Sequence, residues 1–483
     1  MRTPPTKRPA TSTLRTGTGH GRGPGRAPGR PGKPGRRRPP AARARAGTSP
    51  RPLRLDLVDG AVLEVHGLVH DQGWLADRAL ERALRGDRLW ASERRAAAEA
   101  VYGLTRWQGQ LDWLLGARPR PPDLATRYAA WLCRHGGVAP RDAAARLGIP
   151  PARLAALDGA DARLAAVSDP VERLALQGSL PVWIVRRFRE ELGAEEAAAL
   201  VGVLNERAPL TVRANLLRGT RAALLARLAA EGVGAAPTPL SPWGLRLDGH
   251  ENAFALPSFQ EGWFEIQDEG SQLIALAAGA RPGATVVDAC AGAGGKTLAL
   301  AAEMHNRGTL WALDADADRL AEARRRARRA GVDNLRVRAI AAGEEAGAQL
   351  ADLDGRADVV LVDAPCSGLG TLRRRPDARW RLAPGDPDRF AARQRELVAR
   401  FGRLVRPGGR LVYATCAIGR AENDDIADHV ERTLPFDPAP LAPLLGAERA
   451  AAAGADGSRL RLLPHRHGTD GFFVAAFTRR REG

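Results

Sequence analysis

Hydrophobic residues recur at helical spacing over the first half of the chain. Across residues 74–205, apolar side chains repeat every three or four positions, as in Leu75, Ala79, Leu80 and Leu84. This pattern predicts an all-α region. The region contains no cluster of residue types that usually carries out catalysis, so we expect it to serve recognition or scaffolding.

The pattern changes after residue 205, where short apolar runs begin to alternate with a helical segment. We expect strands at Leu210–Leu217, Gly244–Leu247 and Trp263–Ile266, and a helix at Arg221–Glu231. Residues 206–280 are therefore predicted to form a small α+β region between two larger ones.

From residue 281 to residue 483, short β-rich runs alternate regularly with helical segments. The expected strands are Thr285–Ala289, Thr309–Leu313, Val359–Val362 and Arg410–Thr415. This alternation predicts an α/β Rossmann-like domain, with a mostly parallel sheet and helices on both faces. Ligands bind at the carboxyl ends of the strands in such folds, so we expect the chemistry in the loops after these four strands.

The amino-terminal segment lacks such patterning. Residues 1–50 contain ten Pro, nine Gly, 13 Lys or Arg and no acidic residue. A segment with so few apolar side chains cannot bury enough surface to offset the entropy lost when it becomes ordered. We therefore predict a disordered basic tail over residues 1–67. The helical domain is predicted over residues 68–205. The tail contributes 13 of the formal net charge of +18, which leaves +5 for the rest of the chain. Contact with phosphate backbones and a solvated extension without a role explain the tail equally well.

Cysteine usage and hydropathy exclude several protein classes. The four cysteines, Cys133, Cys290, Cys366 and Cys416, include no C-x-x-C pair, so we expect neither a disulfide framework nor a zinc site, and no other metal. No apolar run approaches the roughly 20 residues that span a bilayer. We therefore expect a protein of the reducing cytoplasm. Separately, we expect it to be a monomer.

The first expected strand of the last region leads into a glycine-rich turn and then an apolar helix. Glycines let the backbone approach a ligand, and a helix N-terminus presents free N–H groups. Asp314 follows the second strand, about where an acid accepts ribose hydroxyls. These features predict an adenosine-containing cofactor, and S-adenosyl-L-methionine fits at least as well as a dinucleotide. The turn comprises Cys290, Ala291, Gly292, Ala293, Gly294, Gly295 and Lys296.

The third and fourth expected strands each end beside a cysteine. Asp363 and Cys366 follow the third strand, and Cys416 follows the fourth. A buried cysteine is usually an inert small hydrophobe. Three of the four cysteines lie at strand ends where ligands bind, and packing alone does not explain this placement. We therefore interpret Cys366 and Cys416 as reactive. We expect Cys290 to line the cofactor loop and Cys133 to pack in the helical core.

Two thiols beside a methyl-donor site fit methylation of carbon-5 of cytosine. Carbon-5 is a poor nucleophile until a thiolate adds to carbon-6 and converts the ring into an enamine. A base must afterwards remove the carbon-5 proton so that the thiol can leave, which is covalent catalysis. Methylation of an amino group needs no thiol.

These motifs resemble the Sun-type RNA cytosine-5 methyltransferases. The likeness is to bacterial small-subunit (16S) ribosomal RNA enzymes with a helical N-terminal domain similar to the antitermination factor NusB. It extends over about residues 68–477. It rests on Asp288–Thr297, Asp363–Gly368, Arg374–Trp380, Tyr413–Cys416 and Asp470–Phe473.

The resemblance implies a role for each candidate residue. Cys416 would be the nucleophile, Cys366 would assist product release, and Asp363 would contact the cytosine edge beside the methyl donor. Residues 290–296 would form the cofactor loop, with Lys296 also hydrogen-bonding in the catalytic cleft. Asp314 would hold the ribose, and RNA would be the partner.

The chain departs from the family pattern at two places. The loop usually reads Cys-Ala-Ala-Pro-Gly-Gly-Lys, whereas this chain has Gly292 and Ala293 in the place of the second Ala and the Pro. The acid that usually recognises the adenine amine is missing from the segment containing Ala341 and Ala342.

Three alternatives to a ribosomal RNA methyltransferase remain open. A noncatalytic RNA-binding or assembly factor is favoured by the missing acid and opposed by Cys366, Cys416 and Asp363. A transfer RNA cytosine-5 methyltransferase would share the same motifs. A DNA cytosine methyltransferase is opposed by the Thr-Cys motif and by the helical region.

Overall fold

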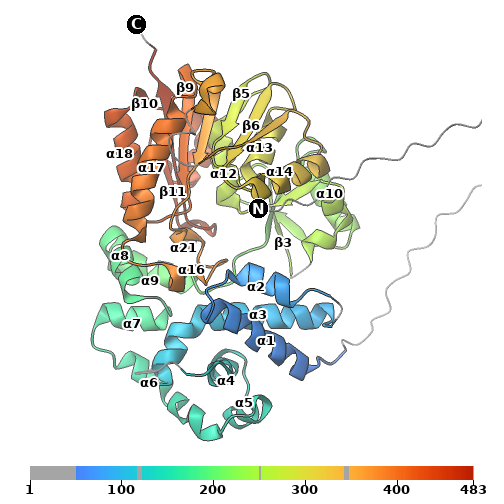
Figure 1. Cartoon of the computed structure of the whole chain (residues 1–483), viewed down its shortest axis with the longest axis vertical. Helices are drawn as coiled ribbons and strands as arrows, with labels where there is room; N and C mark the ends of the chain where they lie inside the picture. Colours follow the sequence, from blue (N-terminus) through green and yellow to red (C-terminus); the bar gives the residue numbers. More distant parts are fainter. Residues whose placement is uncertain (1–50, 87, 117–121, 250–251, 342–347, 482–483) are drawn as a thin grey trace, which may run out of the picture. The chain divides into compact units, whose positions relative to one another are not determined.

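The computed structural model describes residues 51–86, 88–116, 122–249, 252–341 and 348–481 of the chain. Within the compact unit Leu53–Gly483, a helical region, a small antiparallel sheet and a larger mixed sheet follow one another along the sequence (Figure 1). This organisation confirms the predicted fold class. The first 50 residues, on which the tail hypothesis rests, lie outside the described residues.

The helical region is built from helices of 6 to 24 residues around one main apolar core and a second, smaller one. They are α1 (Leu55–His70), α2 (Ala76–Ala83), α3 (Ala91–Leu114), α4 (Leu124–His135), α5 (Pro140–Leu147), the 3-10 helix η1 (Pro151–Leu157), α6 (Ala160–Ala165), α7 (Pro170–Gln177), α8 (Val182–Leu192) and α9 (Ala194–Val203). The helical character predicted for residues 74–205 is confirmed. Similarity of this region to NusB stays a prediction.

The predicted boundary between tail and helical region is wrong. Helix α1 begins at Leu55, inside the segment 1–67 that we expected to be disordered. Its residues Val58, Val62 and Val65 are buried in the core formed with α3 and α4. Their spacing of three and four positions is a helical signal, and the Pro- and Gly-rich composition upstream concealed it.

The small sheet has the strand order β2-β3-β1-β4, with every pair antiparallel. Its core includes Val212, Leu228, Leu245 and Phe264. The expected long first strand is shortened because the chain turns at Asn215. The elements are β1 (Thr211–Ala214), α10 (Arg221–Ala230), β2 (Ala235–Pro237), β3 (Gly244–Leu247), the 3-10 helix η2 (Ala253–Ala255), α11 (Pro257–Gln260) and β4 (Phe264–Ile266).

The larger sheet has the order β10-β12-β9-β8-β5-β6-β7, with β11 paired to β12. All pairs formed between strands β5 to β9 are parallel. All pairs that involve β10, β11 or β12 are antiparallel. Its strands are β5 (Thr285–Asp288), β6 (Thr309–Asp314), β7 (Leu335–Ala339), β8 (Ala357–Asp363), β9 (Val405–Thr415), β10 (Phe436–Pro438), β11 (Arg459–Leu462) and β12 (Phe472–Arg479). Strands β7, β10, β11 and β12 were not among the strands expected from the sequence.

Helices cover both faces of this sheet, because alternate strand residues point to opposite sides. Val287 and Val360 pack with α17 and α18, whereas Val286 and Leu361 pack with α12 and α13. The helices are α12 (Glu269–Ala278), α13 (Gly295–Glu303), α14 (Ala317–Ala330), η3 (Ala351–Leu353), η4 (Leu369–Thr371), α16 (Ala378–Arg381), α17 (Asp386–Gly402), η5 (Arg420–Glu422), α18 (Asp424–Thr433), α19 (Ala442–Leu445), α20 (Ala447–Ala452) and α21 (Pro464–His467).

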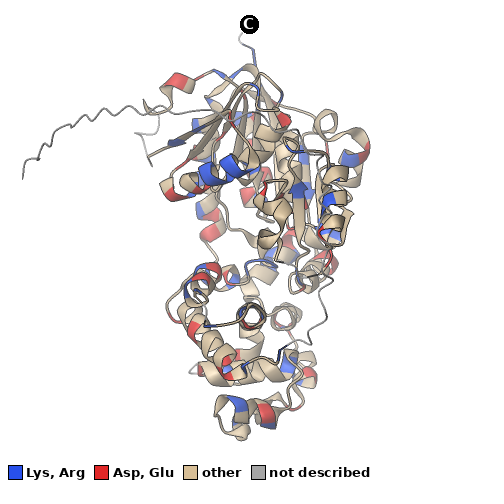
Figure 2. Cartoon of the chain, turned by 90° about the vertical axis from the view of Figure 1, so that its right-hand side faces the viewer, with Lys and Arg blue, Asp and Glu red and all other residues tan. Residues whose placement is uncertain are grey.

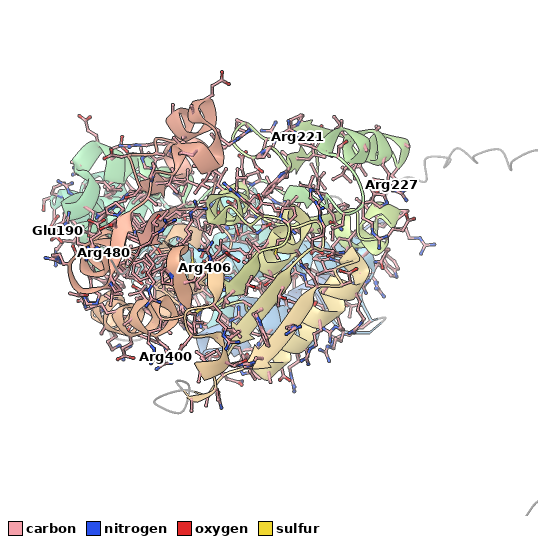
Figure 3. All side chains as sticks on the ribbon, turned by 90° about the horizontal axis from the view of Figure 1, so that it is seen from above. Glu190, Arg221, Arg227, Arg400, Arg406 and Arg480 are labelled. Atoms are coloured by element: carbon pink, nitrogen blue, oxygen red, sulfur yellow. The ribbon has the colours of Figure 1, made fainter. Side chains whose placement is uncertain are left out.

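The strand order reverses between β5 and β8. From β5 the chain runs outward through β6 and β7, and it then returns to β8 on the other side of β5. The carboxyl ends of β5 and β8 therefore flank the crevice where such sheets bind ligands. The opposite edge carries Arg406 and Arg480 (Figure 3), which pair with Asp358 and Asp437.

The segment after Cys366 is embedded in the helical region. Its residues Leu369, Leu372 and Ala378 share an apolar core with side chains of α8 and α9. Trp380 donates its indole N–H to the Thr105 carbonyl at 2.6 Å. The helical region thus contacts the loop that carries the Cys366 thiol.

Arg379 makes the most extensive of these contacts. Its side chain is 0% exposed and donates to the carbonyl oxygens of Arg106, Gly178 and Ser179 at 3.2, 3.3 and 3.2 Å. It also donates to the side-chain oxygen of Asn205 at 3.0 Å. One guanidinium therefore joins the segment after Cys366 to helix α3, to the turn that follows α7 and to Asn205 beyond the end of α9.

Replacing Arg379 should cost much of the stability of the protein. Arg379→Met removes a buried charged donor that hydrogen-bonds three carbonyls and the Asn205 side chain, so we expect a loss of about 3 kcal/mol or more in the free energy of unfolding. Urea unfolding followed by circular dichroism measures it. Arg85→Met, at the exposed Arg85–Glu81 pair, should change stability by less than about 0.5 kcal/mol. Equal losses in both variants would show that Arg379 does not join the regions.

Candidate functional site

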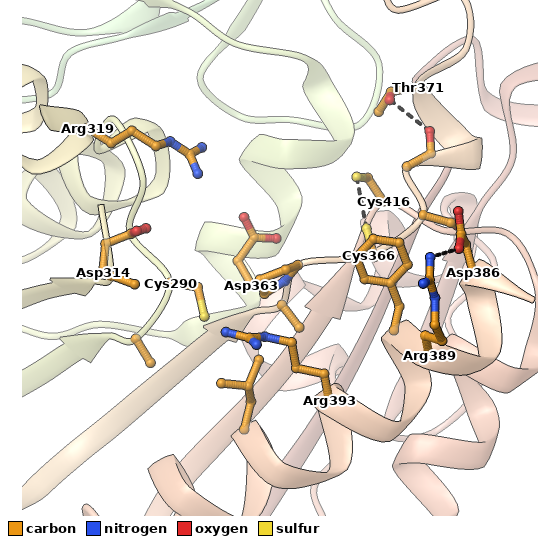
Figure 4. Close-up of a pocket in the computed structure, with 18 of the residues that line it drawn as sticks. Cys290, Asp314, Arg319, Asp363, Cys366, Thr371, Asp386, Arg389, Arg393 and Cys416 are labelled. Atoms are coloured by element: carbon orange, nitrogen blue, oxygen red, sulfur yellow. Dashed lines mark hydrogen bonds and ion pairs between the residues drawn. The ribbon is translucent and has the colours of Figure 1, made fainter. Parts of the chain in front are cut away.

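Two cavities lie at the carboxyl edge of the parallel strands. The larger has a volume of about 580 Å³ and the smaller about 250 Å³. They share Cys290, Arg319 and Asp363 in their walls (Figure 4). Asp314, Cys366 and Cys416 line the larger cavity, whereas Lys296 and the loop after β5 line the smaller one. Of the predicted site residues, Gly294 alone lines neither cavity.

The loop after β5 needs glycine at two positions. Gly292 and Gly294 have φ angles of +54° and +84°, which side chains rarely adopt. A Cβ on Gly292 would lie 2.7 Å from the Arg319 guanidinium, and one on Gly294 would lie 2.9 Å from Ala323. Gly292 donates its backbone N–H to the Asp314 carboxylate at 2.7 Å. The loop and the end of β6 are therefore held together.

Asp288 is a site residue that the sequence analysis missed. Its side chain is 1% exposed and lines the smaller cavity, and Thr297 donates to Oδ2 at 2.6 Å. The other oxygen, Oδ1, has no hydrogen-bond partner among the described residues. Burial raises the pKa of Asp288 to about 7. Its position at the carboxyl end of the first expected strand could have identified it as a site residue.

These residues fit S-adenosyl-L-methionine. The unpartnered oxygen of Asp288 suits the ammonium group of the methionine portion, and Asp314 suits the ribose hydroxyls. Ile340 and Ala341 line the larger cavity together with Leu397 and Phe401 of α17, which gives an apolar wall for an adenine ring. No acid stands at residues 340–341, and Ala342 lies outside the described residues.

Lys296 and Asp363 form an ion pair beside the crevice. The Lys296 ammonium lies 2.6 Å from Asp363 Oδ2, with both side chains mostly buried. Burial lowers the pKa of Lys296, but the charge and hydrogen bond of Asp363 outweigh burial and raise it overall. Lys296 is therefore a fixed positive charge that orients the Asp363 carboxylate between the two cavities.

The two candidate reactive thiols lie next to each other. Cys366 Sγ and Cys416 Sγ are 3.2 Å apart, within hydrogen-bonding distance (Figure 4). The hydrogen bond with Cys416 and burial raise the pKa of Cys366 well above its ordinary value. Burial likewise raises the pKa of Cys290, which lines both cavities. Cys133 packs against the helical core.

Glu422 is a second residue whose role the sequence did not reveal. Its buried carboxylate accepts from the Ser367 backbone N–H at 2.8 Å and from the Ser367 hydroxyl at 2.6 Å. Gln394 donates to the Pro365 carbonyl at 2.9 Å. Burial raises the pKa of Glu422. These contacts fix the loop that carries Cys366.

The wall of the larger cavity differs from most of the described chain in its excess of arginine. Elsewhere, basic and acidic residues are interspersed over the helices and sheets, as Figure 2 shows. The cavity wall contains three carboxylates, Asp314, Asp363 and Asp386, but six arginines: Arg319, Arg375, Arg381, Arg389, Arg393 and Arg400. Three of these lie on α17 at spacings of four and seven residues, which place them on one face of the helix. That spacing was a signal the sequence analysis did not use.

In the described part of the chain, no group of three or more His, Cys, Asp or Glu side chains is placed to hold a metal ion. Among the helices described, none is both long and apolar enough to cross a membrane.

Two known protein families match parts of this chain. The family "16S rRNA methyltransferase RsmB/F" matches residues 275–478, and the ferredoxin-like domain of RsmF/B-like methyltransferases matches residues 180–253. The probable ribosomal RNA small subunit methyltransferase B of Synechocystis is 32% identical over 429 residues, which cover 83% of this chain and 94% of that protein.

Solved structures share the fold. The crystal structure of PH0851 superposes with a TM-score of 0.71 at 26% identity, covering 88% of this chain and 99% of the other. The structure of NSun6 from Pyrococcus horikoshii with SFG has a TM-score of 0.55 at 21% identity and covers 62% and 99%. The chain therefore belongs to the ribosomal RNA small subunit methyltransferase B family, and its catalytic domain has the fold of S-adenosylmethionine-dependent methyltransferases.

Proposed function

We propose that this protein methylates carbon-5 of a cytosine in small-subunit ribosomal RNA through a covalent adduct on Cys416. The observation that carries the proposal is the thiol pair, with Cys366 and Cys416 3.2 Å apart at the ends of two adjacent parallel strands. Family membership supports the class of substrate, and the thiols support the position that is methylated.

The proposed reaction begins at Cys416. As a thiolate, Cys416 forms a bond to carbon-6 of the cytosine, and the displaced electron pair makes carbon-5 nucleophilic. S-adenosyl-L-methionine supplies a methyl group on a positively charged sulfur. After carbon-5 is methylated, a base removes its proton, and the electron pair of that C–H bond expels the Cys416 thiolate.

The neighbouring residues have separate tasks in this scheme. Cys366 is held protonated by its raised pKa, so its S–H can donate to the Cys416 sulfur both before addition and during release. Asp363, oriented by Lys296, can accept a hydrogen bond from the exocyclic amine of cytosine. Glu422 keeps Cys366 in place through Ser367.

The larger cavity suits a nucleotide drawn out of an RNA strand. Enzymes that react with a base extrude it into a pocket. Asp314 and Cys416 both line this cavity. The cofactor ribose and the reacting thiol would therefore lie in the same cavity. The arginines on α17 can neutralise phosphates beside the extruded nucleotide.

Replacement of each thiol should produce a different result. Cys416→Ala should abolish methyl transfer and any protein–RNA adduct, because no enamine can form without the nucleophile. Cys366→Ala should allow addition and slow release, so an adduct should survive denaturing electrophoresis. Incubation with RNA and S-adenosyl-L-methionine followed by gel shift measures both.

Cys133→Ala is the matched control, since that thiol lies in the helical region, and it should behave as the unsubstituted protein does. An adduct in Cys416→Ala but not in Cys366→Ala would reverse the two roles. Normal turnover in both variants would exclude covalent catalysis.

Bisulfite sequencing of RNA from a deletion strain tests the substrate. One 5-methylcytosine in small-subunit ribosomal RNA should disappear and should return with the natural gene but not with Cys416→Ala. Loss of a 5-methylcytosine from transfer RNA would instead support a transfer RNA cytosine-5 methyltransferase. An unchanged pattern would support the noncatalytic assembly factor.

Cofactor binding should depend on the ionisation of Asp288. Burial raises the pKa of Asp288 to about 7 when no cofactor is bound, and only the ionised form attracts an ammonium group. S-adenosylhomocysteine should therefore bind about tenfold more weakly at pH 6 than at pH 8. Isothermal titration across that range measures it. Asp288→Asn should remove the pH dependence, and a dependence that persists would place the titrating group elsewhere.

A further inference from the structure

The loop after β5 is held from within by one backbone hydrogen bond, from the Gly294 N–H to the Ala291 carbonyl at 2.9 Å, and its side chains add little. Residues 291–294 are Ala, Gly, Ala and Gly, so no side chain in this stretch extends beyond Cβ. Such residues are conformationally permissive, especially the two glycines with positive φ. Contacts from outside the loop therefore contribute to fixing the conformation that faces the smaller cavity.

Two arginines provide contacts of this kind. Arg213, on strand β1 of the small sheet, donates to the Gly295 carbonyl at 2.8 Å. Arg326, on helix α14, donates to the Ala293 carbonyl at 2.8 Å. The two acceptors lie on either side of Gly294, the residue that precedes α13. The carbonyls that flank the start of this helix are thus held from two directions.

A buried acid, Glu265, pairs with Arg326 and is the cross-strand neighbour of Arg213. Glu265 lies on β4 directly opposite Arg213 in the pairing of β1 with β4, and it is 3% exposed. Its carboxylate accepts from Arg326 at 2.8 and 3.2 Å, and it also accepts from Arg329. Arg213, itself 2% exposed, also donates to the Gln267 side chain. The network runs from the small sheet to both sides of the loop.

The charges in the network persist at neutral pH. Burial lowers the pKa of Arg213 to about 10, although the charge of Glu265 acts in the opposite direction. Arg213 therefore remains a charged donor, and charged donors make stronger hydrogen bonds to carbonyls than neutral ones do.

We propose that Arg213, Glu265 and Arg326 are positioning residues for the cofactor loop, so that the small antiparallel sheet sets the affinity of the catalytic domain for S-adenosyl-L-methionine. The proposal rests on the assignment of this cofactor to the loop. Neither Arg213 nor Glu265 is among the described residues that line the two cavities. Their effect on the cofactor therefore passes through the loop.

Isothermal titration of the full-length protein with S-adenosylhomocysteine tests the proposal. Glu265→Gln keeps the shape of the side chain but loses its charge, and Arg213→Met loses the donor to Gly295. Each should weaken binding by about tenfold. Arg213→Lys keeps a cation near the carbonyl and should recover most of the affinity, to within about threefold of the unsubstituted protein.

Asp59→Asn is the matched control. Asp59 is a buried carboxylate in the helical region that accepts from Arg146 at 2.5 and 2.6 Å, so the variant makes the same kind of change far from the loop in sequence. It should lower the melting temperature and leave the affinity unchanged.

Unchanged affinity in both Glu265→Gln and Arg213→Met, with melting temperatures lowered as in the control, would overturn the proposal. If Glu265→Gln fails to fold, the comparison of Arg213→Met with Arg213→Lys decides alone. Equal binding by those two variants would likewise overturn it. Failure of the unsubstituted protein to bind would refute the cofactor assignment itself, and is separate from these results.

Discussion

Hydrogen bonds between the parallel strands β8 and β9 place Val362 opposite Tyr413 and Asp363 opposite Ala414. Because both strands end at the same edge of the sheet, the chain leaves them only a few residues before each thiol. The 3.2 Å separation of Cys366 and Cys416 follows from this pairing. A shift of β9 by one residue would turn its side chains to the other face and separate the thiols. The proposed covalent chemistry therefore depends on strand register.

Buried charges then fix the loops that the sheet brings together. Glu422 holds the Cys366 loop, Arg379 anchors the segment after it in the helical region, and Arg213 reaches the cofactor loop from the small sheet. Charged groups without partners are costly in a protein interior, so each network favours a single arrangement of its loop. The helical region and the small sheet thereby take part in shaping the site without lining its reacting end.

The sequence predicted those parts of the site that follow directly from strand ends. The loop 290–296, Asp314, Asp363 and both thiols could be located because each follows a recognisable apolar run. The sequence could not show the partners of Arg379, because Asn205 lies 174 positions away and only the folded chain brings them together. The start of the helical region was placed too late, because the Pro- and Gly-rich composition of the preceding residues was extended over helix α1 despite its regular apolar spacing. The unpartnered oxygen of Asp288 is likewise a property of packing alone.

The most direct test of the covalent proposal is to identify the residue that becomes attached to RNA. RNA containing 5-fluorocytidine blocks the release step, because carbon-5 then has no proton for a base to remove after methylation. After nuclease and trypsin digestion, mass spectrometry should find the nucleotide on the peptide of residues 411–420, which contains Cys416. Attachment to the peptide of residues 357–373, which contains Cys366, or to neither peptide, would contradict the proposed role of Cys416.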